Sequence, residues 1–316
     1  MKDARILTNF LILLMPFLIV SCEHKDIECP GSQEINVSFD WENATDADVD
    51  GMTLFFYPLE ENGHIWRFDI AGKDGGCVEL PSGTYELIAC NNDLPGIRFD
   101  DTGSPSTIYA SARRLDTGDE IDVYANSGML YCGIINRLEV TPCGVRYISN
   151  SGELRECSRR VVRCRPDSVS TLYNLRFINV TGLESVRSAV VELEGVRSSI
   201  LLESGCTSEI PVALSINMDI SPSGATFSGS ACAFAPCDLR SVSYRLKLKI
   251  VRMDGKAFAR NIDVRPEDMN VIARHCVLIT IRNMVIPDEG SPGDIGGIGA
   301  VVDGWEVIEI DLSPTF

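Results

Sequence analysis

The sequence Tyr244-Arg-Leu-Lys-Leu-Lys-Ile250 alternates apolar and basic side chains at every step. A two-residue period of this kind is typical of a β-strand with one buried face. Asp254-Gly255 follows as a turn signal, and a second alternating segment returns after it. The side chains on one face of that second segment are Phe258, Arg260, Ile262 and Val264. Residues 242–264 therefore predict an antiparallel hairpin that packs against a core.

Similar strand patterns occur along the rest of the chain. They cover residues 35–41, 52–57, 66–70, 77–80, 85–90, 134–140, 172–180, 188–196, 199–202 and 275–281. Residues 121–124 are expected to add a strand to the N-terminal unit. The turns between the first strands are short and no long amphipathic helix is evident, which favours a β-sandwich. The predicted fold class is therefore all-β.

One turn fixes an expected register. Pro81-Ser-Gly83 fits a type I turn, with proline at its second position and glycine at its fourth. If this turn closes a hairpin, Leu80 lies opposite Thr84, and Cys77 lies opposite Leu87. The two strands are then expected to be neighbours in one sheet.

The length and charge of the chain limit its organisation and its partners. The chain has 316 residues and a formal net charge of −17. The length favours two domains, and the charge argues against nucleic acid as a partner. Five arginines crowd one short stretch: Arg155, Arg159, Arg160, Arg163 and Arg165. We place the domain boundary after them, which gives a β-sandwich over residues 34–165 and another over residues 166–316, each expected to fold separately. The arginines are interpreted as the charged surface of an edge strand, with a docking patch or a processing site as alternatives.

Cysteine is frequent, but no metal-binding pattern accompanies it. The chain has 12 cysteines and no Cys-x-x-Cys motif. None of His24, His64 and His275 has two cysteines at the spacing of a zinc site. We therefore expect no zinc and no cofactor. Most of the cysteines are expected to be small apolar core residues, and one or more disulfides are the alternative.

The N-terminus has the pattern of an export signal. Residues 10–20 are an apolar run after a short basic start, too short to span a bilayer as a helix, which needs about 20 residues. Leu18-Ile-Val-Ser-Cys22 resembles the lipobox of bacterial lipoproteins, in which the cysteine thiol receives a diacylglycerol and becomes the new N-terminus. The resemblance implies a lipoprotein signal peptide over residues 1–21, a palmitate-bearing lipid on Cys22, and a lipidated tether over residues 22–33. A plain secretion signal or a buried strand is the alternative.

Other motifs carry little chemistry. Asp46, Asp48 and Asp50 alternate as at the start of an EF-hand calcium loop. The twelfth position of that loop is Tyr57 rather than a bidentate acid, so the three residues are a weak calcium candidate and an acidic turn is preferred. Residues 290–299 are rich in glycine and fit a flexible linker. No Gly-x-Ser-x-Gly or His-Glu-x-x-His motif occurs, so no catalytic residue is predicted.

Four segments combine strand and turn chemistry in a recognisable order. They are Val-x-Phe-Asp-Trp at 37–41, Gly-Met-x-Leu-x-Phe-Tyr-Pro at 51–58, Gly-Gly-x-Val-x-Leu-Pro-x-Gly-x-Tyr-x-Leu at 75–87, and Val-Asp-Gly-Trp-Glu at 302–306. Together with the lipobox they resemble the fimbrillin-like surface lipoproteins of Bacteroidales, which include fimbrial anchor and accessory subunits. The resemblance implies two tandem transthyretin-like β-sandwiches. In that family, anchor subunits keep their lipid, whereas shaft subunits are cut and polymerise by strand exchange.

The resemblance also implies a function. It predicts a non-enzymatic protein that is lipid-anchored in the cell outer membrane, exposed at the surface, and active in adhesion or fimbrium assembly as an anchor or accessory subunit. The implied partners are the membrane, through the N-terminal lipid, and fimbrillin-like subunits. The alternative is a glycan-binding surface lipoprotein of a nutrient-uptake system, which predicts a row of exposed Trp or Tyr side chains.

Two further sites complete the predictions. The last strand carries the apolar residues Trp305, Val307, Ile308, Ile310 and Leu312 after the glycine-rich link. Such a strand either completes its own domain or adds to an open sheet edge on a partner subunit. Asp167-Ser168-Val169 resembles the Asp-Ser/Thr-apolar acceptor of O-glycosylation in Bacteroidales, which makes Ser168 a glycosylation candidate.

Overall fold

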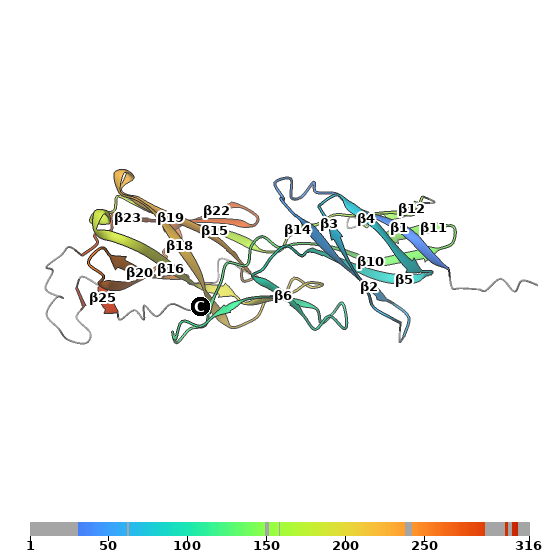
Figure 1. The fold of residues 1–316 in the computed structure, drawn as a ribbon, viewed down its shortest axis with the longest axis horizontal. Helices are drawn as coiled ribbons and strands as arrows, with labels where there is room; N and C mark the ends of the chain where they lie inside the picture. Colours follow the sequence, from blue (N-terminus) through green and yellow to red (C-terminus); the bar gives the residue numbers. More distant parts are fainter. Residues whose placement is uncertain are drawn as a thin grey trace, which may run out of the picture.

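The computed structural model describes residues 31–287, except 62, 149–151, 158 and 238–241, together with the backbone of residues 301–302 and 305–308. Figure 1 shows the strands gathered in two groups along the long axis, the N-terminal group on the right and the C-terminal group on the left. In this part of the chain, the only helical elements are short 3₁₀ turns, and no helix could cross a membrane. The predicted all-β sandwich class is confirmed.

Two sheets enclose the first core in the N-terminal half. The smaller sheet has the order β13 (Val161–Cys164), β1 (Ser32–Phe39) and β4 (Gly75–Pro81). The larger has the order β12 (Leu154–Cys157), β11 (Gly144–Ile148), β10 (Tyr131–Thr141), β5 (Gly83–Asn91), β2 (Gly51–Pro58) and β3 (Trp66–Ala71), and β14 (Asp167–Ser168) also pairs with β10. Ile35 and Val78 from one sheet meet Leu54 and Leu87 from the other in this core.

The larger sheet is buried on both faces at its centre. A third, three-stranded sheet covers its second face, in the order β17 (Ser199–Leu201), β7 (Tyr109–Ala112) and β6 (Ile97–Asp100). As a result, Leu54 and Phe56 of β2 face the first core, whereas Phe55 and Tyr57 face a different hydrophobic core on the opposite side of the sheet. Burial on both faces explains why β2 and β5 are nearly continuous apolar runs instead of alternating ones.

The C-terminal half folds one long sheet around its own core. The strand order is β22 (Met269–Ala273), β23 (Cys276–Arg282), β15 (Thr171–Ile178), β19 (Thr226–Ala233), β18 (Pro211–Ser221), β16 (Val186–Arg197), β20 (Arg245–Arg252), β21 (Ala257–Asp263), β25 (Trp305–Ile308) and β24 (Val301–Val302). β18 pairs with β16 along most of its length and with β19 at its end, so it connects the two walls. The enclosed core includes Phe177, Val191, Phe227 and Leu248.

The two halves share one feature of topology. In each, the first strand is flanked by one antiparallel neighbour and by one parallel neighbour from late in the same half. β1 lies between β4 and the parallel strand β13, and β15 lies between β19 and the parallel strand β23. The sequence shows no short repeat, but the structure repeats this arrangement.

The hairpin predicted over residues 242–264 is confirmed. β20 and β21 are antiparallel neighbours, with Leu248 opposite Arg260. Leu246, Leu248 and Ile250 are buried, as the alternation requires.

The hairpin predicted at Pro81-Ser-Gly83 is wrong. β4 pairs with β1 and β5 pairs with β2 and β10, so the turn carries the chain from one sheet to the other. Leu80 lies opposite Gln33 and Thr84 lies opposite Glu139. The Tyr85 hydroxyl donates to the Pro81 carbonyl at 3.0 Å and fastens this corner. Local turn chemistry is the same for a hairpin and for a corner, so it did not separate the two.

Two other expectations concern strand placement. β9 (Val123–Tyr124), which was expected in the N-terminal unit, pairs instead with β18 of the C-terminal half, so that expectation is wrong.

The arginine-rich stretch forms β12 and β13, and each lies at the edge of its sheet. Arg155 and Arg163 lie in these two edge strands, as the interpretation of edge-strand charge requires, whereas Arg159, Arg160 and Arg165 lie outside them.

Candidate functional site

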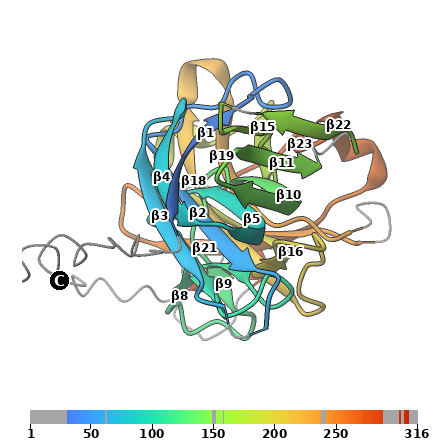
Figure 2. The ribbon, with the colours of Figure 1, turned by 90° about the vertical axis from the view of Figure 1, so that its right-hand side faces the viewer.

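The two halves exchange strands where they meet. The chain leaves the N-terminal sheet after β5 and returns at β10; we call residues 92–130 between them the junction segment. This segment receives β17 from the C-terminal half beside β7, and it places β9 beside β18. Figure 2 looks along the molecule from its N-terminal half and shows β8 (Arg114–Leu115) and β9 below the N-terminal strands.

Backbone hydrogen bonds fasten both exchanged strands. The Ala112 amide donates to the Ser198 carbonyl at 2.8 Å, and the Leu202 amide donates to the Ile108 carbonyl at 3.1 Å. At the other connection, the Ala213 amide donates to the Asp122 carbonyl at 3.0 Å. Each half therefore completes a sheet of the other.

A third core lies under these exchanged strands. It contains Phe55 and Ile88 from the N-terminal sheet, Ile108 from the junction segment, and Ile200 and Phe234 from the C-terminal half. All five side chains are buried. The interface between the halves is thus a hydrophobic core, and not a loose contact between two independent domains.

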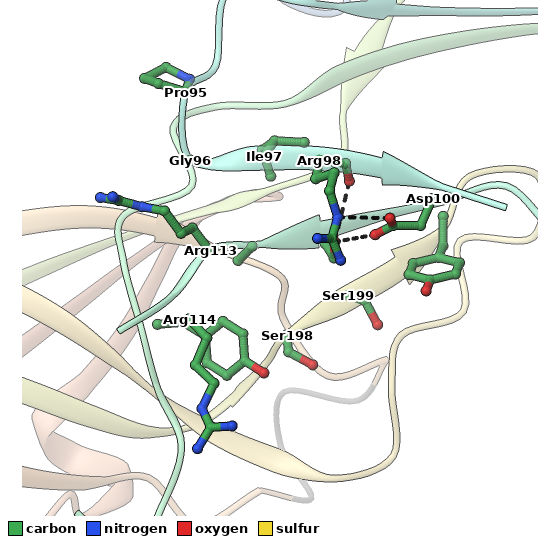
Figure 3. A pocket seen from close by; sticks show the side chains of 13 residues that line it. Pro95, Gly96, Ile97, Arg98, Asp100, Arg113, Arg114, Ser198 and Ser199 are labelled. Atoms are coloured by element: carbon green, nitrogen blue, oxygen red, sulfur yellow. Dashed lines mark hydrogen bonds and ion pairs between the residues drawn. The ribbon is translucent and has the colours of Figure 1, made fainter. Parts of the chain in front are cut away.

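A pocket of about 530 Å³ opens at the junction (Figure 3). Residues of β6 and β7 line it together with Ser198 and Ser199 from the C-terminal half. Arg98, Arg113 and Arg114 also line it, which concentrates positive charge in an acidic chain. The described lining residues include no histidine, cysteine or glutamate.

One ion pair lies within this pocket. Arg98 Nε lies 2.7 Å from Asp100 Oδ1, and the Ser111 hydroxyl donates to Asp100 Oδ2 at 2.7 Å. The hydrogen bonds from Ser111 and Arg98 lower the pKa of Asp100. Figure 3 shows Arg98 turned toward Asp100, whereas Arg113 and Arg114 point in other directions. The three guanidinium groups do not converge on one point, so the pocket is not organised around a single anion.

An ionic cluster holds the junction segment on the C-terminal sheet. Asp119 accepts hydrogen bonds from Lys247 at 2.5 Å and from Lys249 at 2.8 Å, and Lys249 also donates to Glu192 at 2.6 Å. Burial alone would raise the pKa of Asp119, but the two lysines lower it well below its usual range. We call Asp119, Lys247, Lys249 and Glu192 the junction clasp.

The predicted calcium candidate lies in an exposed loop before β2. Asp46, Asp48 and Asp50 are exposed, while the intervening Ala47 and Val49 are buried in the first core. No group of three or more potential metal ligands forms among the residues that the structure describes. Calcium binding at this loop stays a prediction, and the geometry adds no support for it.

Ser168 lies where the two halves face each other. It is half-buried in β14, opposite Tyr131 of β10, and its amide donates to the Asp167 side chain at 2.8 Å. It lines a second pocket of about 660 Å³, which Asp46 and Arg274 also line. Arg274 reaches across to Asp167 at 2.7 Å. O-glycosylation of Ser168 stays a prediction.

The predicted lipid site and part of the last strand lie outside the described residues. These are Cys22, Ile310 and Leu312. The backbone containing Trp305, Val307 and Ile308 forms β25, which pairs antiparallel with β21 and with the short strand β24. The described part of the last strand therefore lies near one end of the C-terminal sheet order.

Sequence reasoning missed the junction pocket and the junction clasp. None of the four segments that carry the family resemblance falls within the junction segment. The one local signal was Arg113-Arg114, two adjacent arginines in an acidic chain. The partners of Asp119 lie 128 and 130 residues further along, and no local pattern indicates them.

Comparisons with known proteins agree with this architecture. The chain is 28% identical over 215 residues to a Bacteroides ovatus protein named "Putative fimbrium anchoring subunit Fim4B", and the match covers 64% of this chain and 58% of that protein. The crystal structure of a "putative adhesin" from Bacteroides ovatus superposes with a TM-score of 0.62 at 19% identity, covering 86% of this chain and 99% of that one. A structure described as "putative polysaccharide binding proteins" from Bacteroides thetaiotaomicron gives a TM-score of 0.50 at 13% identity, covering 79% and 91%.

The match to the protein named as a fimbrium anchoring subunit confirms the resemblance to fimbrillin-like proteins, and the two structures confirm the fold. A family described as "Domain of unknown function (DUF5119)" matches residues 21–217, which include the N-terminal sandwich, the junction segment and the start of the C-terminal sandwich. The chain therefore belongs to the family described as Domain of unknown function (DUF5119).

Proposed function

We propose that this protein is a non-enzymatic surface subunit that anchors or accompanies a fimbrium and acts in adhesion or fimbrium assembly. The observation that carries the proposal is the 28% identity to the protein named as a fimbrium anchoring subunit, because that match covers 64% of this chain. The match covers only 58% of the relative's length. The function of the whole relative is therefore a proposal for this chain.

The proposed attachment to the cell is a lipid on Cys22. The sequence before it resembles a lipobox, and the acidic tether after it separates the anchor from β1. Two or more acyl chains hold a protein stably on a membrane, whereas one chain does not. The protein is accordingly proposed to be anchored in the outer membrane with its sandwiches exposed at the surface. Its proposed domains keep the boundary at residues 165 and 166, with the junction joining them.

The proposed partners are fimbrillin-like subunits, and the last strand is the proposed element of assembly. β25 pairs with β21 in the C-terminal sheet of this chain. This pairing fits the alternative, in which the last strand only completes its own sheet. Strand addition uses the same backbone groups to join one protein to another. Truncation after Gly299 separates these possibilities.

The alternative of glycan binding is not favoured. It predicted a row of exposed aromatic side chains, but Trp41 and Trp66 are partly buried and pack against the first core. Trp41 contacts Tyr131 edge-on, and Trp66 stacks on Phe68 within β3. Both rings are thus in contact with other aromatic side chains of this protein.

Co-purification tests the proposal. The full-length chain carrying an affinity tag in an exposed loop is purified from membranes of its own cells under mild detergent. Fimbrillin-like subunits are expected to co-purify, and cells lacking the protein are expected to shed fimbriae into the medium. Normal retention of fimbriae, together with no fimbrillin-like subunit in the purified material, would refute it.

A further inference from the structure

Two cysteines mark the points where the junction segment leaves and rejoins the N-terminal sheet. Cys90 is the penultimate residue of β5, and Cys132 is the second residue of β10. Between them the chain builds β6, β7, β8 and β9 before it returns. The pair therefore closes the base of the whole excursion that connects the two halves.

The two side chains face each other directly. Cys90 lies opposite Cys132 in the antiparallel register, and their Sγ atoms are 2.8 Å apart. That separation is shorter than an ordinary non-bonded contact, which is about 3.5–4.0 Å between heavy atoms. It is longer than the covalent S–S bond of about 2.05 Å. Cys90 is completely buried and Cys132 is 8% exposed, so both belong to the third core.

We infer that Cys90 and Cys132 form a cross-strand disulfide that closes the base of the junction segment. Each thiol loses one proton and one electron, and the bond forms between the two sulfur atoms. A disulfide-bearing thiol oxidoreductase of the cell envelope accepts the two electrons and two protons and becomes a dithiol. Such an oxidant is available in the cell envelope, so this part of the inference rests on the envelope location given by the proposed function.

Cys164 is the competing partner, and the sheet separates it from Cys132. Cys164 is completely buried in the first core, whereas Cys90 and Cys132 lie in the third. Gly133 follows Cys132 and faces the other side, where a Cβ atom would come within 2.5 Å of Cys164 Sγ. Because successive side chains of a strand point to opposite faces, Cys132 points away from Cys164.

The buried position also sets when the bond forms. Burial raises the pKa of the Cys90 thiol, so the thiolate needed for exchange is suppressed in the folded protein. The bond must therefore form before the third core closes over it. Once formed, it limits how far the junction segment can move in the unfolded chain.

Peptide mapping without reduction tests the inference on the full chain. Two samples are compared: protein exported by its own cells, and protein refolded from denaturant with oxidised glutathione. In both, free thiols are alkylated in denaturant before digestion. We expect a peptide pair linked through Cys90 and Cys132 in each sample. Alkylation of both cysteines in each sample would overturn the inference. A link in the refolded sample alone would show that the disulfide does not form in the cell, which would overturn the inference. The proposed function is tested separately, by co-purification of fimbrial subunits.

Cysteine variants provide the matched control. Cys164→Ala should keep the link, whereas Cys132→Ala should abolish it and leave Cys90 open to alkylation in denaturant. Loss of the link in Cys164→Ala with a new adduct on Cys90 would overturn the inference. Reduction should lower the thermal midpoint of the wild type but not that of the double variant Cys90→Ala/Cys132→Ala. An equal shift in both proteins would contradict a role for this bond.

Discussion

Replacing Asp119 by asparagine removes the central charge of the junction clasp while keeping the size of the side chain. The carboxylate accepts hydrogen bonds from Lys247 and Lys249, and it is only 17% exposed. Hydrogen bonds to charged groups contribute about 1.5–3 kcal/mol each. The amide oxygen of asparagine can still accept one of them, and Lys249 keeps its bond to Glu192. We therefore expect Asp119→Asn to lower the free energy of unfolding by about 2 kcal/mol at pH 7.

The matched control is Asp122→Asn in the same segment. Asp122 lies 2.7 Å from Arg114, but the two side chains are 43% and 66% exposed. Ion pairs of such exposure contribute about 0–1 kcal/mol because water and salt screen them. Urea unfolding followed by circular dichroism measures both variants against the wild type. A loss in Asp119→Asn no larger than that in Asp122→Asn would refute the clasp.

The pH dependence gives an independent check of the same carboxylate. The pKa of Asp119 is lower in the folded protein than in the unfolded chain, where it is about 3.9. The charged form therefore stabilises the fold above pH 3.9, and this contribution declines as the pH falls toward the folded-state value. The stability difference between wild type and Asp119→Asn should be constant from pH 7 to about pH 5 and should shrink below about pH 4. A difference that stays constant down to about pH 2 would show that the charge is not its cause.

Four more outcomes are expected. Cys22→Ala should release the protein from membranes and abolish incorporation of radiolabelled palmitate, and incorporation equal to wild type would exclude lipidation at that residue. Truncation after Gly299 should leave the protein folded by circular dichroism and remove co-purifying subunits; misfolding would show that the last strand completes the domain, and a folded truncation that keeps every partner would eliminate it as the assembly element. Limited proteolysis within residues 155–170 should give two half-size fragments that stay together in gel filtration because the halves exchange strands, and separation without denaturant would count against the junction. Phe234→Ala, in the third core, should cost about 3–5 kcal/mol in urea unfolding, and a loss below about 1 kcal/mol would show that this core adds little.

Sequence patterns predicted strands well where one face of a strand is apolar and the other is polar. β20 is the clearest case, because the buried Leu246 and Leu248 alternate with Lys247 and Lys249, whose side chains are 27% and 24% exposed and pair with Asp119. β2 and β5 were predicted as strands, but the sequence did not predict that both of their faces are covered. The third sheet, which covers the second face, contains β17 from a distant part of the chain.

The elements that the sequence did not indicate are pairings over long separations. β9 is a two-residue strand whose partner begins at Pro211, and so short a segment has no period of its own. The opposition of Cys90 and Cys132 depends on the register between β5 and β10, which are separated by the junction segment. The corner at Pro81 was missed for a related reason, since a turn fixes the local path of the chain but not the neighbours of the strands it joins.

The exchanged strands have a mechanical consequence. The described chain begins beside β1 at one end of the long axis, and β25 lies toward the other (Figure 1). Tension applied between these ends passes through the contact between the halves. There, the β7–β17 pair, the β9–β18 pair and the buried Phe234 must all give way before the halves can separate. Under tension the two halves should therefore behave as one rigid unit and not as two domains joined by a flexible linker.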